Sequence, residues 1–216
     1  MTDVSELNVV GGHLALDLVN TVEPRVPDRA IGREHLRSTE DLLAWSRRLG
    51  VVSREEAEQV ETSWAASSEG DSALSAAREI REATYDVLLA ALRRSERTAA
   101  APLGILHRYW SAAAGRAVLS LTPDATTQDR LRVGTGPATV IPDRLAQAAV
   151  DLVRWLEVEH LKACPLEDGG CGWLFLDRSR NSSRRWCSMD DCGAKAKARR
   201  LTARRRRIRS SSARKV

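Results

Sequence analysis

The stretch NSSRRWCSMDDCGAKAKARR, residues 181–200, decides the organisation of the chain. It sets two cysteines, Cys187 and Cys192, directly before a run of basic residues. The other two cysteines of the sequence, Cys164 and Cys171, lie a short distance upstream. Clustered cysteines in a chain without signs of secretion are more often metal ligands than disulfide partners. We therefore predict a metal site that fixes the start of the basic segment.

The four cysteines follow the spacing C-x6-C-x15-C-x4-C, which suits a structural zinc site. Zinc in such sites takes four tetrahedral ligands, and four thiolates leave no open position for a catalytic water. Four unrelated thiols, or a redox role, remain the alternative, and only His160 lies near enough in sequence to replace a cysteine. We expect one structural Zn²⁺ per chain, held by Cys164, Cys171, Cys187 and Cys192.

The residues between the two cysteine pairs predict a β-hairpin. An apolar and aromatic half, GWLFLD, precedes a polar turn and a return half that ends at Trp186. The second cysteine pair then stands at the entrance to a helix, where Asp190 or Asp191 is available as a cap. A knuckle, a hairpin and a helix in this order predict a treble-clef zinc finger within residues 162–216.

Residues 1–161 predict a mainly helical α+β body. Ser53 and Glu56 have the spacing of a capping box, and apolar periodicity marks further helices. The expected helices cover STEDLLAWSRRLG, SREEAEQVETSW, DSALSAAREIREATYDVLLAALRR, APLGILHRYWSAAAG and PDRLAQAAVDLVRWLEVEH. Between the last two, RAVLSLTPD and DRLRVGTGPATVI alternate apolar with polar residues, as in a small hairpin. The change of pattern at Lys162–Cys164 marks the predicted domain boundary.

Charge divides the chain into two electrostatic parts. Residues 178–216 hold 15 Lys and Arg against 2 acidic residues, a net charge of +13, whereas residues 1–177 carry 19 basic and 27 acidic residues, a net charge of −8. This asymmetry indicates an acidic body with an end that binds polyanions. A solvated basic tail or an anionic membrane surface would suit the same charge, but large apolar residues for membrane insertion are nearly missing.

Drawn as a helix, the segment after Cys192 has a narrow apolar edge and basic faces elsewhere. Arginine suits both phosphate oxygens and the edge of guanine, so we expect nucleic-acid binding, with double-stranded DNA as the first choice. RNA binding and a protein-interaction finger remain the alternatives. The residues expected to contact phosphates or bases are Arg184, Arg185, Lys195, Lys197, Arg199, Arg200 and Arg204.

The sequence offers no nucleophile with a neighbouring base and no phosphate loop, so we expect a binding protein and not an enzyme. Its first 20 residues lack a basic stretch followed by an apolar one, and no apolar run reaches the roughly 20 residues that cross a bilayer. We expect a cytoplasmic protein without membrane contact. The 30 Arg and 4 Lys are typical of a GC-rich bacterial genome, and a homodimer would suit paired DNA half-sites.

The stretch CGWLFLDRSRNSSRRWCSMDDCGAKAKARR resembles the CGNR zinc finger of bacterial proteins. Near the start, LALDLVNTVEPR, followed by LRSTEDLLAWSRRLGVV, resembles the ABATE domain that precedes this finger. The resemblance covers essentially the whole chain. It implies a transcription regulator with a DNA-binding treble clef and a body that senses a small-molecule effector.

The signature LDLVNT…R of the body implies a ligand or partner site at Asp17, Asn20, Thr21 and Arg25. Alternatively, Asn20 and Thr21 satisfy backbone groups at the end of a helix or strand, which we favour. The chain departs from the C-G-N-R motif that gives the family its name, because Ala194 and Lys195 stand where the motif has Asn and Arg. Lys195 keeps the charge but lacks the bidentate fork of arginine, and Ala194 lacks an amide. We expect the zinc site to survive these changes, whereas a base contact by an Asn–Arg pair has no equivalent here.

Overall fold

The computed structural model describes residues 4–26, 32–95, 99–119 and 131–213, with side chains described as far as residue 203. The helices are α1 (Leu14–Val19), α2 (Thr39–Arg48), α3 (Arg54–Ala65), α4 (Glu69–Leu92), α5 (Ala100–Gly115), α6 (Val140–Trp155) and α7 (Ala194–Ala213). Antiparallel strand pairs are β1 (Val22–Glu23) with β2 (Arg33–Glu34), β3 (Val118–Leu119) with β4 (Leu131–Arg132), and β5 (Leu161–Ala163) with β6 (Leu174–Leu176). The fold is therefore the predicted α+β class, mainly helical with small strand pairs.

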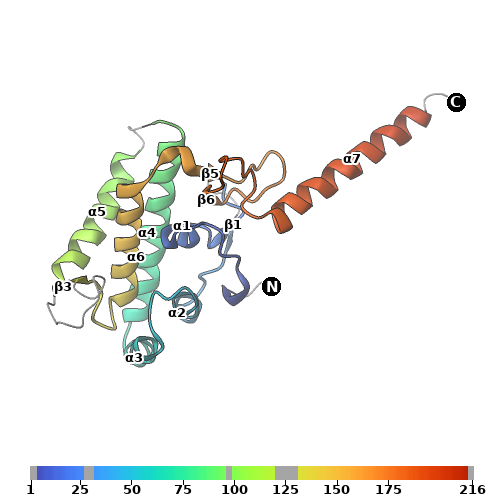
Figure 1. Ribbon diagram of the computed structural model, residues 1–216. Helices are drawn as coiled ribbons and strands as arrows, with labels where there is room; N and C mark the ends of the chain where they lie inside the picture. Colours follow the sequence, from blue (N-terminus) through green and yellow to red (C-terminus); the bar gives the residue numbers. More distant parts are fainter. Residues whose placement is uncertain (1–3, 27–31, 96–98, 120–130, 214–216) are drawn as a thin grey trace.

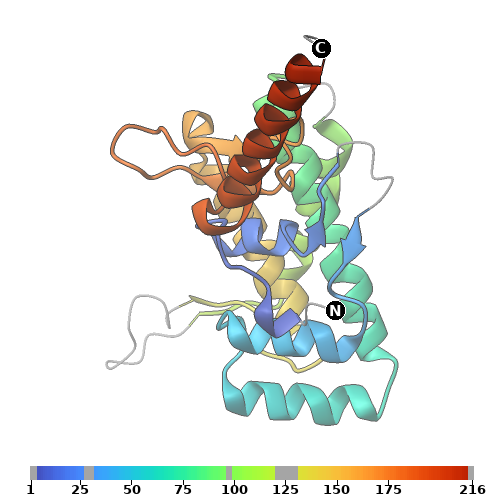
Figure 2. The same ribbon diagram turned by 90° about the vertical axis from the view of Figure 1, so that its right-hand side faces the viewer.

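Helices α4, α5 and α6 lie side by side and form the main layer of the body (Figure 1). Their facing sides bury aliphatic residues such as Ile80, Leu88 and Leu145, which are shielded almost completely from solvent. Each such side chain contributes roughly 1.5–3 kcal/mol relative to exposure in water. Helices α2 and α3 pack at one end of this layer (Figure 2). Among the described residues, no helix is both long and apolar enough to traverse a bilayer.

The start signals expected from the sequence are present in the body. At α2, the Ser38 side chain accepts a hydrogen bond from the backbone N–H of Asp41. At α3, Ser53 and Glu56 form both hydrogen bonds of the capping box. The small hairpin between α5 and α6 pairs β3 with β4, while residues 120–130 of the predicted segment lie outside the described residues.

The short helix α1 runs across α4 and α6 and is buried after its first residue, Leu14. The His13 side chain caps it by accepting a hydrogen bond from the backbone N–H of Ala15. On its other side, α1 packs against β6 of the finger. Helix α1 therefore lies between the helical layer and the finger, and its residues determine how the two parts meet.

The finger begins with β5, turns through the Cys164–Cys171 knuckle and returns as β6. A π-helical turn over Met189–Gly193 leads into α7, which stands apart from the body (Figure 1). The Ser188 side chain caps this turn by accepting a hydrogen bond from the backbone N–H of Asp191, so the predicted cap at Asp190 or Asp191 is wrong.

The hairpin predicted between the two cysteine pairs is also misplaced. Strand β6 pairs backward with β5, across the first cysteine pair, and residues 177–187 form an irregular loop. The buried Asp177 carboxylate organises that loop by accepting hydrogen bonds from Lys162 Nζ at 2.6 Å and from the backbone N–H groups of Ser179 and Arg184. Burial opposes ionisation of Asp177, but these donors outweigh it and hold its pKa well below the usual range. Side-chain hydrogen bonds thus replace the expected ladder of backbone bonds.

Candidate metal centre and nucleic-acid interface

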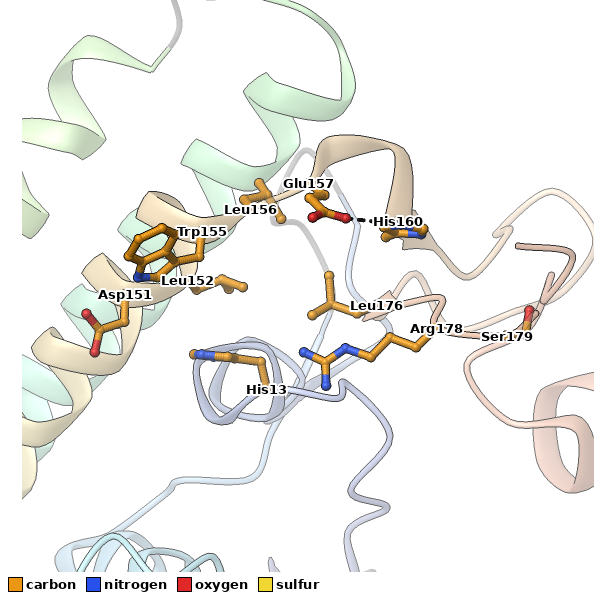
Figure 3. Close-up of a pocket in the computed structure, with 10 residues that line it drawn as sticks. All are labelled: His13, Asp151, Leu152, Trp155, Leu156, Glu157, His160, Leu176, Arg178 and Ser179. Carbon is orange, nitrogen blue, oxygen red and sulfur yellow. Dashed lines mark ion pairs between the residues drawn. The ribbon is translucent and has the colours of Figure 1, made fainter. Parts of the chain in front are cut away.

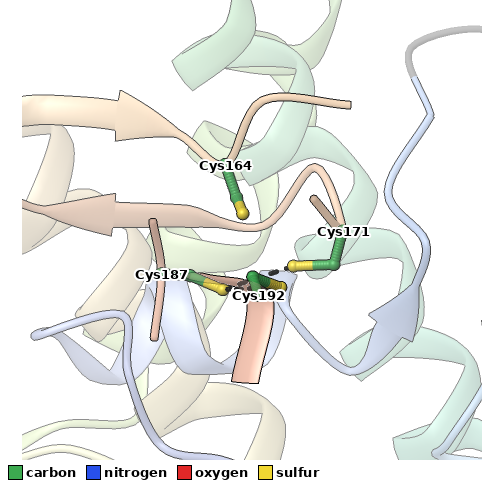
Figure 4. A group of neighbouring side chains, drawn as sticks. All are labelled: Cys164, Cys171, Cys187 and Cys192. Carbon is green, nitrogen blue, oxygen red and sulfur yellow. Dashed lines mark hydrogen bonds between the residues drawn. The ribbon is translucent and has the colours of Figure 1, made fainter. Parts of the chain in front are cut away.

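Four buried cysteine sulfurs converge in the finger, all within 4.8 Å of one another (Figure 4). Cys164 follows β5, Cys171 precedes β6, Cys187 ends the irregular loop and Cys192 lies in the turn before α7. The Sγ atoms of Cys171 and Cys187 are 3.3 Å apart, and those of Cys187 and Cys192 are 3.7 Å apart. All four cysteines are free thiols. The structure therefore brings together the four residues predicted from their spacing.

This geometry fits a tetrahedral zinc ion. Zn–S bonds of about 2.3 Å place tetrahedral sulfurs about 3.8 Å apart, close to the separations observed. Hydrogen bonds from the Cys171 and Cys187 thiols lower the pKa of Cys164, whereas hydrogen bonding to Cys164 raises the pKa of Cys171. Only a bound cation would let all four thiols ionise in so small a volume. The residues accordingly form a closed, structural four-thiolate zinc site without a position for a reacting water.

The body closes the free edge of strand β6. The Asn20 amide donates a hydrogen bond to the Leu174 carbonyl at 2.9 Å and accepts one from the Leu174 N–H at 3.0 Å. Two residues further on, the Leu176 N–H donates to the Gly11 carbonyl at 2.9 Å. The Asp17 carboxylate holds this segment by accepting from the backbone N–H of Gly11 at 2.8 Å. Asn20 and Asp17 therefore serve to dock the finger on the body.

Arg25 joins the body to the zinc knuckle through both its backbone and its side chain. Its backbone N–H donates to the Cys171 carbonyl at 2.7 Å. The buried guanidinium forms an ion pair with Glu82 at 2.8 Å and stacks on the Tyr85 ring at 4.4 Å. The Arg25 carbonyl lies against Gly172, whose φ of +75° and lack of a side chain allow this close approach.

Thr21 completes the signature at the centre of a buried ion network. Its hydroxyl donates to the Leu18 carbonyl at 2.8 Å and accepts from Arg81 Nη1 at 3.0 Å. Arg81 also forms an ion pair with Glu34 at 2.6 Å. We therefore interpret Asp17, Asn20, Thr21 and Arg25 as an internal docking set. The hydrogen bond from Thr21 to Leu18 is a local backbone contact of the kind favoured from the sequence, whereas the Asn20 amide bonds a distant strand.

Sequence reasoning missed Arg81 and its acidic partners, Glu34 and Glu82. A signal was available, because Arg81 follows Leu74 by seven residues and Ala77 by four, which places it on the buried face of α4. A charged residue on an apolar helical face needs a partner. Burial opposes ionisation of Glu82, but Arg25 and Arg81 outweigh it and lower its pKa.

Arg184, expected at the nucleic-acid surface, is engaged inside the finger. Its guanidinium donates to the Trp186 carbonyl at 3.0 Å, to the Cys187 carbonyl and to the Val10 carbonyl at 3.3 Å. It also stacks on the Phe175 ring at 4.4 Å. These contacts orient the loop that carries a zinc ligand. We therefore assign Arg184 to the framework of the finger and remove it from the proposed contact surface.

The other expected contact residues lie on the first turns of α7 and beside them. Asp168 of the knuckle forms ion pairs with Arg185 and, at 3.7 Å, with Arg200. The Lys195 ammonium contacts Asp191 at 2.6 Å, and this hydrogen bond raises the pKa of Lys195. Lys197 and Arg199 are exposed and form no ion pair within the described part of the chain. The side chain of Arg204 lies outside the described residues.

Replacing a zinc ligand tests the metal centre. Cys187→Ser should reduce bound zinc from one ion per chain to well below one, because a serine hydroxyl resists deprotonation and binds zinc weakly. Zinc content after gel filtration, measured by inductively coupled plasma mass spectrometry, provides the readout. His160→Ala is the matched control and should keep a full zinc ion. Full zinc occupancy in Cys187→Ser would contradict the assignment.

Removing the Asn20 amide tests the docking of the finger. Asn20→Ala leaves the buried N–H and carbonyl of Leu174 without partners, and each unsatisfied group costs about 1–3 kcal/mol. We expect the free energy of unfolding of the zinc-loaded protein to fall by about 2–6 kcal/mol, measured by urea denaturation. The exposed Asn181 supplies the control, and Asn181→Ala should change stability by less than about 0.5 kcal/mol. Equal stability of the two variants would argue against docking through Asn20.

Two family models match the sequence and together span most of it. Residues 12–158 match the ABATE model, described as a "putative stress-induced transcription regulator", and residues 160–205 match the CGNR zinc finger. No curated protein matches the chain significantly. The two matches meet at the short 3-10 turn Val158–His160, directly before β5. The ABATE match covers more than half of the sequence and the finger match includes all four converging cysteines, so the chain belongs to the ABATE family and carries a CGNR zinc finger.

Proposed function

We propose that this protein is a transcription regulator that binds double-stranded DNA through its zinc finger and α7. The observation that carries the proposal is the position of α7. The helix starts directly after the zinc ligand Cys192 and then leaves the body (Figure 1). A metal centre at its base would hold a strongly basic helix in one direction, which a simple charged tail would not require.

The dimensions of α7 support a role in groove binding. Its 20 residues correspond to about 30 Å, and an α-helix with side chains is about 10–12 Å wide. The major groove of B-form DNA is about 12 Å wide and admits such a helix. Its first described turns carry four exposed basic residues, Lys195, Lys197, Arg199 and Arg200. These residues, with Arg185 beside them, form the contact surface that we propose.

Charge supports a polyanionic partner over an apolar one. Residues 178–216 carry a net +13, and the sequence has no acidic residue after Asp191. Arg184 is part of the framework, and nine of the other 14 basic residues of this stretch lie on α7. RNA and an acidic protein surface are the competing partners. Homodimerisation, a small-molecule effector and a cytoplasmic location stay predictions.

We also propose that the chain acts by binding and not by catalysis. The candidate zinc site uses four cysteines, and a four-thiolate set leaves no coordination position for a substrate or a water. The titratable residues of the signature, Asp17 and Arg25, are engaged with backbone groups and buried partners. Their arrangement supports docking of the finger.

The salt dependence of DNA binding tests the contribution of α7. Each phosphate contact contributes about −0.9 to the slope of log K against log salt concentration. The double variant Lys197→Ala/Arg199→Ala should therefore reduce the magnitude of this slope by about 2. Fluorescence polarisation of the zinc-loaded protein with a random-sequence duplex, at several salt concentrations, measures the effect. The variant should keep one zinc ion per chain, because Lys197 and Arg199 are both exposed and neither is among the four converging ligands.

A matched control separates local contacts from total charge. Arg47→Ala/Arg93→Ala removes the same charge from exposed positions of the body and should leave the slope nearly unchanged. Identical slopes for both double variants would contradict binding through α7. Displacement of the duplex by equimolar single-stranded RNA would favour the RNA-binding alternative. Negligible binding of both nucleic acids would favour a protein partner.

A further inference from the structure

A cavity of about 470 Å³ lies at the seam between the body and the finger (Figure 3). The body contributes His13, which caps α1, and the last turns of α6 from Asp151 to Leu156. The finger contributes Leu176 of β6 and the two exposed residues Arg178 and Ser179. The volume falls within the range of small-molecule sites, about 300–1,000 Å³. None of the four signature residues Asp17, Asn20, Thr21 and Arg25 lines it.

One part of the cavity is apolar and includes an unusually exposed indole. Leu152, Leu156 and Leu176 line the space, and Trp155 stands at its rim with 72 % of its surface exposed. By contrast, Trp45, Trp173 and Trp186 are buried. A large aromatic side chain left in water beside three leucines gains contact area when a flat or branched apolar group binds.

The opposite part of the cavity offers hydrogen-bond donors for an anion. The Arg178 guanidinium reaches across the opening toward His13 (Figure 3) and forms no hydrogen bond or ion pair with the described residues. His13 accepts a hydrogen bond at Nδ1 from the Ala15 N–H at 3.2 Å, so its neutral ring carries the proton on Nε2. Burial lowers the pKa of His13 and favours this neutral form. The arginine fork is suited to a carboxylate, whereas the His13 ring points toward Asp151 (Figure 3).

Two acidic residues, Glu157 and Asp151, also line the cavity and differ in their effect on an anion bound at Arg178. Glu157 forms an ion pair with His160 at 3.2 Å, which offsets its charge when the imidazole is protonated. Asp151 stands on α6, on the far side of His13 from Arg178 (Figure 3). An anion bound at Arg178 would still feel some repulsion from Asp151, so removal of that carboxylate should strengthen binding.

We propose that this cavity binds a small organic carboxylate with an aromatic or branched apolar body. Arg178 holds the carboxylate, and the apolar body packs against Trp155 and the leucines. The site joins α1 and α6 of the body to the segment that follows β6. A ligand there contacts both parts of the molecule and so favours one arrangement of the finger on the body. That such a ligand is an effector of DNA binding rests on the proposed function, whereas the binding site itself does not.

Isothermal titration calorimetry of the zinc-loaded full chain tests the site directly. The probes are 2-naphthoate and 4-methylpentanoate, with 2-naphthamide as the neutral match for naphthoate. We expect one site per chain that prefers 2-naphthoate to 2-naphthamide. Arg178→Gln should weaken 2-naphthoate binding about tenfold or more, and Trp155→Ala by a similar factor. Asp151→Asn should strengthen it severalfold.

Arg180→Gln provides the control, since Arg180 is exposed, carries the same charge two residues away and does not line the cavity. Its affinity for 2-naphthoate should stay within about twofold of the unmodified protein. Failure of both carboxylates to bind at millimolar concentration would overturn the proposal. Equal binding of 2-naphthoate and 2-naphthamide, unaffected by Arg178→Gln, would overturn it as well.

A second measurement addresses the effector role separately. Polarisation titrations of duplex DNA with and without saturating 2-naphthoate should show a changed dissociation constant, and Arg178→Gln should remove the change relative to Arg180→Gln. Calorimetric binding together with an unchanged DNA affinity would overturn the effector role and support the site alone. If the protein fails to bind DNA at all, the calorimetric result still decides whether the cavity is a ligand site.

Discussion

The pairing of the Asn20 amide with the backbone of Leu174 is the constraint on which the arrangement of the molecule depends. Strand β6 pairs along one edge with β5, and without the body the backbone groups of its other edge would be unpaired. Asn20 and the Gly11 carbonyl satisfy that edge from the body. The finger therefore completes its own hydrogen bonding only when it is docked, and an isolated finger would expose part of a strand edge.

The body segment from Asn20 to Arg25 also stabilises and orients the metal centre. From Asn20 to Arg25 the body runs beside Cys171–Leu174, and Trp173 Nε1 donates to the Val22 carbonyl at 2.8 Å. The Arg25 and Arg81 guanidinium groups are buried and pair with the half-buried carboxylates of Glu82 and Glu34, so water screens these charges only in part. Removing one partner would leave an uncompensated charge beside the seam. The signature residues of the body, Asn20 to Arg25, are thus explained by their contacts with the finger.

The sequence was sufficient wherever the local chemistry is specific. Four cysteines in one quarter of the chain predict the zinc cluster, and Ser53 with Glu56 predicts the start of α3. The sequence was insufficient where contacts between distant segments determine the environment of a side chain or the pairing of a strand. The sequence does not distinguish an arginine that faces solvent from one that, like Arg184, donates hydrogen bonds to three backbone carbonyl groups. The partner of β6 is a three-residue strand, Leu161–Ala163, too short to carry a pattern of its own, and its pairing follows from closure of the knuckle.

Asp168 gives the basic surface an internal counterion. Its carboxylate neutralises part of the charge of Arg185 and Arg200 while no polyanion is bound. In the DNA complex that we propose, a phosphate that pairs with either guanidinium would lie beside the displaced Asp168 carboxylate, and their repulsion would be the same at every position along the duplex. This repulsion would shorten the residence time of the protein on DNA more than it would slow association, because the long-range field of α7 remains. The same carboxylate would therefore limit how long any contact through Arg185 and Arg200 persists.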